Sequence, residues 1–234
     1  MTQAISLEAV GLELGGRHIV HDLTVTLEAH RIAVIGANGS GKSTLLRLLD
    51  GLVPPTTGTI SVHGIDPAYE ARRLHRHVGF IFTNPDAQIV MPTAREDLAF
   101  SLRGVRDENG RRLDRAVIAE RVDTWLAAHG LADHADSSAH TLSGGQKQLL
   151  AIGAVLIREP GLVLADEPTT MLDLPNARLV GDLLIDELTQ PVVIATHDLE
   201  LAARCDVAVR FAHGTISRVG DPAELIAEYR AEFA

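Results

Sequence analysis

The chain has 234 residues, a mass of 25.1 kDa and a net charge of −10 at neutral pH. Its 46% hydrophobic content is enough to bury the core of one domain, with room for an inserted lobe. The acidic balance argues against nucleic acid as the main partner, because that binding depends on clustered Lys and Arg. No signal peptide and no apolar run of roughly 20 residues is visible, so we expect a soluble protein, which leaves contact with a membrane protein open.

The N-terminal third favours β-structure. Apolar or alternating runs predict strands at residues 5–14, 19–27, 31–35, 59–63 and 78–82. The run at 32–35 leads directly into a glycine-rich loop. A helix is expected after that loop, at residues 44–49, and it should stop at Asp50-Gly51.

The glycine-rich loop at residues 36–43 has the complete phosphate-binding pattern G-x-x-x-x-G-K-[ST]. Its glycines let backbone N–H groups point inward, and the following helix adds a partial positive charge. Lys42 should reach the β- and γ-phosphates, and the Ser43 hydroxyl should ligate Mg²⁺. A glycine-rich turn with a chance Lys-Ser pair is the alternative, which the strand–loop–helix context disfavours. The nucleotide-binding residues expected here are Gly36, Asn38, Gly39, Ser40, Gly41, Lys42, Ser43 and Thr44.

Helical character dominates between residues 84 and 141. The segment 114–129 places four apolar side chains on one helical face, and Gly130 closes it. These side chains are Ile118, Val122, Trp125 and Leu126. We expect Trp125 in the core of this lobe, since aromatic side chains are usually buried, and a solvated loop at the charged residues 103–115.

The second half of the chain alternates helices with apolar strands. A helix is expected from residue 143 to about 158, a strand at 162–165, and a helix that begins near Pro175. A strand at 192–196 and a short helix from Asp198 follow. This alternation predicts an α/β fold with a parallel sheet covered on both faces. The single cysteine, Cys205, excludes an intrachain disulfide and is expected to be a buried, inert thiol.

Two acidic residues end the strand at 162–165. Ligands bind beyond the carboxyl ends of strands in an open parallel sheet, so Asp166 is placed to hold Mg²⁺. Glu167 would lie next to the site and could polarise an attacking water. Alone, this pair is a weak signal, since a solvated turn would look the same. The phosphate-binding loop upstream strengthens it.

The string at residues 142–146, Leu-Ser-Gly-Gly-Gln, starts the helix that follows it. Ser143 is a good N-cap and Gln146 stands at the capping-box position. Gly144 and Gly145 expose backbone N–H groups at the helix start, which predicts a second anion site. A generic capped helix is the alternative, and the five-residue string disfavours it.

Together these motifs resemble the ATP-binding cassette (ABC) ATPases. Residues 36–43 are similar to their Walker A motif, 162–167 to Walker B, 142–146 to the signature sequence and 170–173 to the D-loop, and His197 to the switch histidine. The resemblance implies a P-loop NTPase (RecA-like) core with an N-terminal antiparallel β region and an inserted α-helical subdomain. It implies one ABC ATPase domain over 1–234, with the core at 1–83 and 160–234 and the helical signature subdomain at 84–159.

In that family two such domains pair head to tail. The resemblance implies ATP and Mg²⁺ between the P-loop of one chain and the signature of a second chain, either an identical copy or a paralogue. Ser143, Gly144, Gly145 and Gln146 would contact the partner's ATP. Glu167, His197 and Lys42 would be the catalytic residues, with Glu167 as the general base and His197 at the γ-phosphate. Asp173 would link the two sites, and Ser43 and Asp166 would hold the metal.

Two departures from the family pattern stand out. A glutamine usually follows the strand that ends near residue 82, and this chain has Thr83 there, so its metal or water contact is in doubt. Gln88 is a weak candidate for the missing side chain. The aromatic side chain that usually stacks on adenine is also absent, because Leu14 and His18 occupy that neighbourhood. We therefore expect weak selectivity between purine bases.

The segment at residues 83–93, TNPDAQIVMPT, resembles the ATPases of energy-coupling-factor (ECF) importers, and most closely those of biotin importers. Cobalt, nickel and other vitamins remain alternative substrates, and a soluble, non-transport ABC ATPase remains the rival class. The resemblance implies a peripheral protein at the cytoplasmic face of the cell membrane. Its partners would be a transmembrane coupling subunit, docked in a groove floored by residues 83–93 and the helical lobe, and a substrate-binding membrane subunit.

Overall fold

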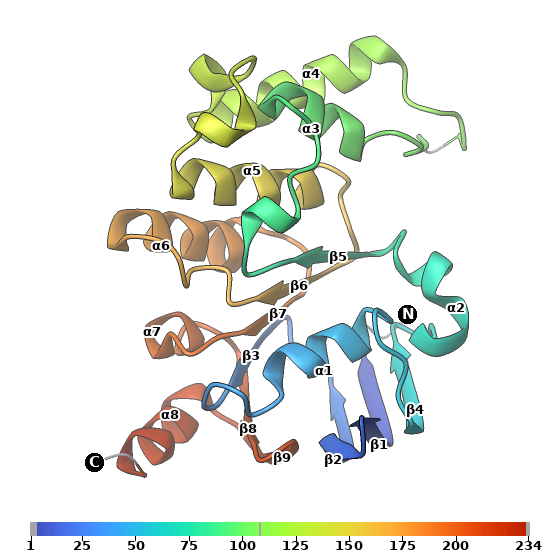
Figure 1. Ribbon diagram of the computed structural model, residues 1–234, viewed down its shortest axis with the longest axis vertical. Coiled ribbons are helices and arrows are strands. Elements are labelled where there is room, and N and C mark those ends of the chain that lie inside the picture. The colour runs from blue at the N-terminus through green and yellow to red at the C-terminus, as the bar shows by residue number, and fades with distance from the viewer. Residues whose placement is uncertain (1–3, 108, 233–234) are drawn as a thin grey trace.

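The computed structural model describes residues 4–107 and 109–232, whose strands form two sheets (Figure 1). The larger sheet has six strands in the order β5 (Val78–Ile81), β6 (Leu162–Asp166), β7 (Val192–Ala195), β3 (Arg31–Ile35), β8 (Val207–Ala212) and β9 (Thr215–Gly220). The first five run parallel, and β9 pairs antiparallel with β8. The smaller sheet is antiparallel, in the order β2 (Arg17–Leu27), β1 (Ile5–Leu14) and β4 (Thr57–Val62). The α/β architecture predicted from the sequence is confirmed.

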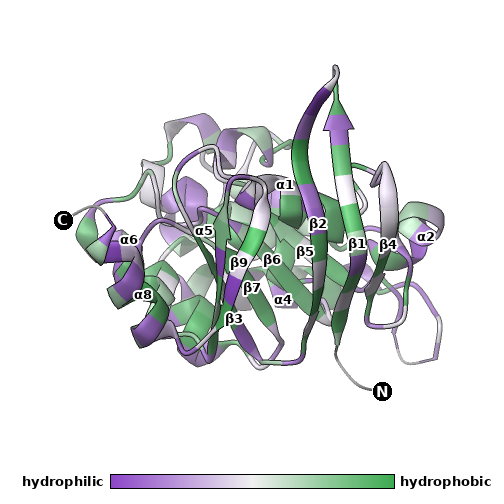
Figure 2. Ribbon diagram, turned by 90° about the horizontal axis from the view of Figure 1, so that it is seen from below, coloured by the Kyte–Doolittle hydropathy of each residue, from purple (hydrophilic) through white to green (hydrophobic). Residues whose placement is uncertain are grey.

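The parallel strands are mostly apolar because both faces of the sheet are covered. Every residue of β3, β6 and β7 is buried, and Figure 2 shows the inner strands as mostly hydrophobic. Successive side chains of a strand point to opposite faces. Accordingly, Ala33 and Ile35 belong to one hydrophobic cluster, and Ile32 and Val34 belong to the other.

Helices pack on both faces of the larger sheet and above it. The core carries α1 (Lys42–Leu49), α2 (Pro67–Leu74), α6 (Leu174–Asp182) with its π-helical continuation η4 (Leu183–Glu187), α7 (Leu199–Ala202) and α8 (Pro222–Ala231). Between β5 and β6 the chain forms η1 (Pro85–Ala87), α3 (Ala94–Ser101), α4 (Arg115–Ala128), η2 (Ala132–His134), η3 (Ala139–Thr141) and α5 (Gly144–Leu156). In Figure 1, α3, α4 and α5 lie at the end of the molecule opposite the three-stranded sheet.

The apolar face predicted for residues 114–129 packs as expected. Val122 and Leu126 are fully buried, and Ile118 and Trp125 pack against the same cluster. The indole of Trp125 lies directly over α5, where a Cβ added to Gly153 would stand 2.2 Å from its Nε1. This close approach joins α4 to the helix that begins with the signature.

The structure adds elements that the sequence analysis did not predict, namely α2, β8, β9 and α8. Strand β8 lies inside the sheet beside β3, whereas β9 is an edge strand whose residues are all partly or fully exposed. Burial raises the pKa of Cys205 to about 12, in agreement with an inert thiol. No helix in the described part of the chain is long and apolar enough to cross a membrane.

Candidate nucleotide site and docking cavity

The phosphate-binding loop rests on a buried aromatic side chain. Gly36, at the end of β3, has φ 154°, and a Cβ there would stand 2.1 Å from the Phe211 carbonyl oxygen. Gly41 has φ 114°, and its added Cβ would lie 2.7 Å from the Phe211 ring. Only glycine fits both positions. Phe211 comes from β8 and is missing from the sequence prediction, because no local pattern connects it with a loop some 170 residues away.

Lys42 places its charge inside this loop. Its ammonium group donates hydrogen bonds to the carbonyl oxygens of Gly36, at 2.9 Å, and Ala37, at 3.2 Å. It also lies 3.7 Å from a carboxylate oxygen of Glu167, and its side chain is only 5% exposed. A buried cation at the positive end of α1 forms a strong site for an anion such as phosphate.

Ser43 and Asp166 meet where α1 begins and β6 ends. The Ser43 hydroxyl donates to an Asp166 carboxylate oxygen at 2.6 Å. Burial raises the pKa of Asp166, although the bond from Ser43 opposes the shift. Thr83 donates its hydroxyl to the Asp166 carbonyl oxygen at 2.9 Å. Thr83 therefore fixes the backbone at the end of β6.

These oxygen atoms have the ligand chemistry that Mg²⁺ prefers, so the residues fit the ion. No group of three His, Cys, Asp or Glu residues that could hold a metal occurs within residues 4–107 and 109–232. A cation beside Ser43 and Asp166 would consequently need further oxygens, such as those of a triphosphate.

Glu167 has a strained backbone, and one oxygen of its carboxylate is held by several contacts. Its φ is 51°, in the left-handed region that non-glycine residues seldom occupy. One carboxylate oxygen accepts from the hydroxyl of Thr170 at 3.0 Å and lies 2.7 Å from Nδ1 of His197. The backbone N–H of His197 donates to the same oxygen at 3.3 Å. This arrangement holds a carboxylate where it could orient a water. The sequence analysis did not predict that Thr170 holds the Glu167 carboxylate.

The signature residues form the capping box that the sequence predicted. The backbone N–H of Ser143 donates to the Gln146 side chain at 2.9 Å, and the Gln146 N–H donates to the Ser143 hydroxyl at 3.3 Å. A Cβ on Gly145 would lie 2.4 Å from the side chain of Asn176. Asp173 holds Asn176 in place, because it caps α6 and accepts from the Asn176 amide at 2.6 Å. Asn176 was not among the predicted residues.

Within one chain the two halves of the predicted site stay apart. Figure 1 shows α1 in the lower part of the molecule and α5 in the upper part, with β6 and α6 between them. No hydrogen bond or ion pair joins residues 36–44 to residues 143–146 in the described structure. Asp166, Glu167 and His197 lie beside the P-loop. Asp173 lies beside the signature, through its bond to Asn176.

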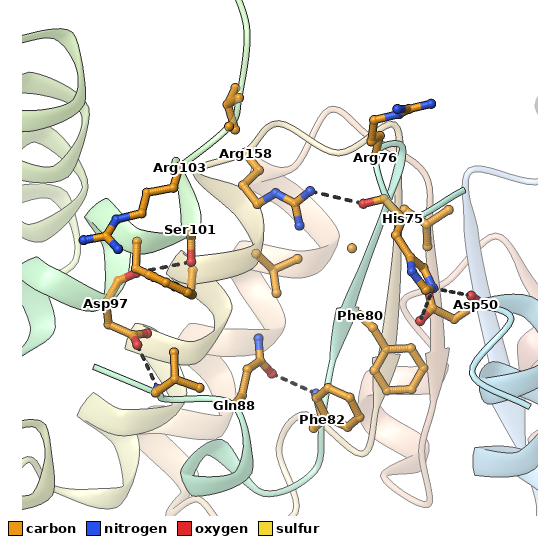
Figure 3. A pocket seen from close by; sticks show the side chains of 18 of the residues that line it. Asp50, His75, Arg76, Phe80, Phe82, Gln88, Asp97, Ser101, Arg103 and Arg158 are labelled. Atoms are coloured by element: carbon orange, nitrogen blue, oxygen red, sulfur yellow. Dashed lines mark hydrogen bonds and ion pairs between the residues drawn. The ribbon is translucent and has the colours of Figure 1, made fainter. Parts of the chain in front are cut away.

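A cavity lies at the edge of the larger sheet that is formed by β5 (Figure 3). Its floor includes Phe80 and Phe82, whose ring centroids are 4.7 Å apart. Exposed apolar side chains and four arginines surround this floor: Leu52, Val90, Phe100, Arg76, Arg103, Arg106 and Arg158. We call this hollow the β5 cavity. Of the predicted segment 83–93, only Gln88 and Val90 line it.

Gln88 does not point its amide at the Asp166 site. Its oxygen accepts from the Phe82 N–H at 3.1 Å, and its nitrogen donates to the Ala151 carbonyl at 2.9 Å. At the β1–β2 hairpin, Leu14 is 54% exposed, and neither strand contains Phe, Tyr or Trp.

The comparisons with known proteins agree with this geometry. A family model described as ABC transporter matches residues 20–170. The biotin transport ATP-binding protein BioM of Rhizobium etli is 42% identical over 226 residues, which cover 97% of each chain. The energy-coupling factor transporter ATP-binding protein EcfA1 of Symbiobacterium thermophilum is 41% identical, covering 84% of this chain and 68% of its own.

Among solved structures, CbiO1 of Clostridium perfringens, part of the ABC transporter complex CbiONQ, superposes with a TM-score of 0.82. The two chains are 29% identical, and the match covers 97% of this chain and 92% of the other. The family model and the relatives both extend across the P-loop, the signature and the strand ending in Asp166. The chain therefore belongs to the ABC transporter family, as an ATP-binding protein that hydrolyses ATP to drive transport.

Proposed function

We propose that this chain is the ATP-hydrolysing subunit of an ECF-type membrane importer and that the imported substrate is biotin. The observation that carries the proposal is the 42% identity with a biotin transport ATP-binding protein over nearly the whole chain. The similarity to an energy-coupling factor ATP-binding protein supports the type of importer. The ATPase subunit has no need to touch the vitamin, so the identity of the cargo depends on this similarity alone.

The P-loop side of the site supplies the hydrolytic machinery. Lys42 and the loop N–H groups bind the β- and γ-phosphates, and Ser43 and Asp166 hold Mg²⁺, which would neutralise charge on the phosphates. Glu167 orients the attacking water and accepts its proton. His197, which contacts Glu167, would contact the γ-phosphate. Catalysis of this kind depends mainly on positioning and on charge stabilisation.

A second ATPase chain, identical or paralogous, completes the site. Ser143, Gly144, Gly145 and Gln146 would contact the nucleotide bound by the partner's P-loop. Support comes from the separation of the two halves within one chain and from the apolar side chains of Met171 and Leu174, which are 69% and 62% exposed next to Asp173. Apolar side chains this exposed are characteristic of association surfaces.

The membrane partners would dock at the β5 cavity. Its apolar floor and arginine-bearing rim suit a segment of a transmembrane coupling subunit, which would in turn hold the substrate-binding membrane subunit (Figure 3). The chain would then lie at the cytoplasmic face of the membrane as a peripheral subunit.

Affinity purification from native membranes tests the proposal. We expect the chain to co-purify with two integral membrane proteins, and the complex to retain biotin. Retention of cobalt, nickel or another vitamin instead would overturn the choice of substrate. Recovery of only soluble or ribosomal partners would overturn the importer and favour a non-transport ABC ATPase.

New negative charges at the cavity test the docking site. Arg103→Glu and Val90→Asp should weaken recovery of the membrane complex while leaving ATP binding unchanged, because both residues line the β5 cavity, which includes no P-loop residue. Arg230→Glu, on the exposed face of α8, is the matched control and should leave recovery intact. Equal recovery of all three variants would contradict docking at this cavity.

A further inference from the structure

One face of α5 contacts β5 and the segment that runs from β5 to residue 88. Lys147, Ala151 and Val155 are spaced by four residues and therefore lie on one side of the helix. At the first turn, the Lys147 ammonium is 2.7 Å from a carboxylate oxygen of Asp86. At the last, Val155 packs so closely on β5 that a Cβ added to Gly79 would stand 2.3 Å from it.

The middle link is the side-chain amide of Gln88. Its oxygen accepts from the N–H of Phe82, the residue directly after β5, and its nitrogen donates to the carbonyl of Ala151. The next residue, Thr83, donates to the Asp166 carbonyl. A single amide thus connects the helix that starts at the signature with the backbone that supports the nucleotide site.

The three contacts, at Asp86, Gln88 and Val155, differ in how strongly they fix the orientation of α5. The carboxylate of Asp86 is 57% exposed, and ion pairs at the surface contribute little. The packing of Val155 on Gly79 sets a distance, but apolar contact is not directional. The Gln88 amide has both its partners on the backbone and bonds both, so it restricts rotation of α5 about the packing point.

We propose that Gln88 is a positioning residue that orients α5, and with it Ser143 and Gly144, toward the nucleotide of the partner chain. The inference rests on the proposed head-to-tail dimer. Gln88 also lines the β5 cavity, so a segment docked there would contact the same amide that orients the signature (Figure 3). Docking and closure of the dimer would then be linked through one side chain.

ATP-induced dimerisation in the Glu167→Gln background tests the proposal by sedimentation over a range of concentrations. Gln88→Met keeps the length of the side chain and removes both hydrogen bonds. Gln88→Glu keeps the acceptor for Phe82 but places a carboxylate against the Ala151 carbonyl. We expect both variants to weaken dimerisation about tenfold or more, while binding of MgATP to the monomer changes by less than about twofold.

Thr93→Ala is the matched control. It removes the side-chain cap of α3 in the same lobe and leaves the link between α5 and β5 intact. This variant should dimerise like the Glu167→Gln parent at matched thermal stability. Equal dimerisation by the Gln88 variants and the parent, or equal weakening by Thr93→Ala, would overturn the inference alone. A parent that does not dimerise with ATP would overturn the proposed dimer and this inference with it.

Discussion

The P-loop and the signature are attached to the molecule in different ways. The backbone of the P-loop packs directly against the core, with Gly36 against the Phe211 carbonyl and Gly41 against the Phe211 ring. At the signature, Gly144 has almost open space where a Cβ would stand, with one atom at 4.0 Å. The helix behind it is tied to the sheet by side chains such as Gln88.

This difference matches what the two regions must do. A loop that binds phosphate needs N–H groups in a fixed arrangement, and close packing of backbone on a buried ring provides rigidity. In the proposed dimer the signature completes a neighbour's site, so it must adjust to that neighbour. Helix α5 packs on the sheet through its apolar side chains, and the directional bonds of the Gln88 amide add an orientation to that packing.

Removal of the Glu167 charge should produce the largest effect on the P-loop side. Glu167→Gln keeps the size and most hydrogen bonds of the side chain but removes the base, so we expect hydrolysis to fall by about 10²- to 10⁴-fold. Phosphate release and nucleotide binding measured together check this result. ATP affinity should persist, and unchanged turnover would remove Glu167 from its role.

Alanine at the two glycines compares the attachments directly. Gly36→Ala places a Cβ against the Phe211 carbonyl in a left-handed backbone conformation, so we expect a loss of about 1–3 kcal/mol in the free energy of unfolding and loss of ATP binding. Gly144→Ala should change stability by less than about 0.5 kcal/mol and leave monomer binding intact. Its defect should appear in the dimer. Denaturant unfolding measures the stability of the two variants, and nucleotide titration measures their ATP binding. Equal destabilisation by the two substitutions would contradict the difference in attachment between the P-loop and the signature.

Asp50 predicts a pH-dependent effect at the rim of the β5 cavity. Burial raises its pKa from 3.8 to about 6, against the opposing charge of His75, whose Nε2 lies 3.5 Å away. Because the folded-state pKa is raised, protonated Asp50 stabilises the fold. This contribution is complete below pH 3.8 and is lost as the pH rises through about 6. Asp50→Asn cannot ionise, so we expect it to gain about 1–3 kcal/mol over the wild type at pH 7.5 and little at pH 4.

Unfolding of Asp50→Asn and the wild type across pH 4–8 measures this gain. His75→Gln is the companion variant, and it should destabilise the protein near pH 6 because it removes the cation that opposes the Asp50 shift. A difference between Asp50→Asn and the wild type that stays constant with pH would rule out Asp50 as its source.

The smallest effect is expected in base selectivity. Strands β1 and β2 offer no Phe, Tyr or Trp for stacking, and a missing stacking contact forfeits about 1 kcal/mol of discrimination. ATP and GTP should therefore be hydrolysed with kcat/KM values within about tenfold of each other. A much larger preference for ATP would show that another side chain, such as His18, recognises adenine.

Much of the site follows from short contiguous motifs. The P-loop, the capping box of Ser143 and Gln146, and the carboxylates after β6 are each encoded within a few residues. Their chemistry depends on neighbours along the chain, so the sequence predicts them directly. The α/β class follows similarly, because a parallel strand covered on both faces requires an unbroken apolar run.

The tertiary structure decided which distant residues support these motifs. Phe211 lies under the P-loop, Thr83 holds the backbone of Asp166, Asn176 packs on Gly145, and Gln88 joins β5 to α5. Apart from the Gln88–Phe82 bond, which spans six residues, the partners in these contacts are about 30 or more residues apart, so no local period or spacing encodes them. Only folding brings such groups together, because a hydrogen bond or a packing contact depends on distance in space and not on separation along the chain.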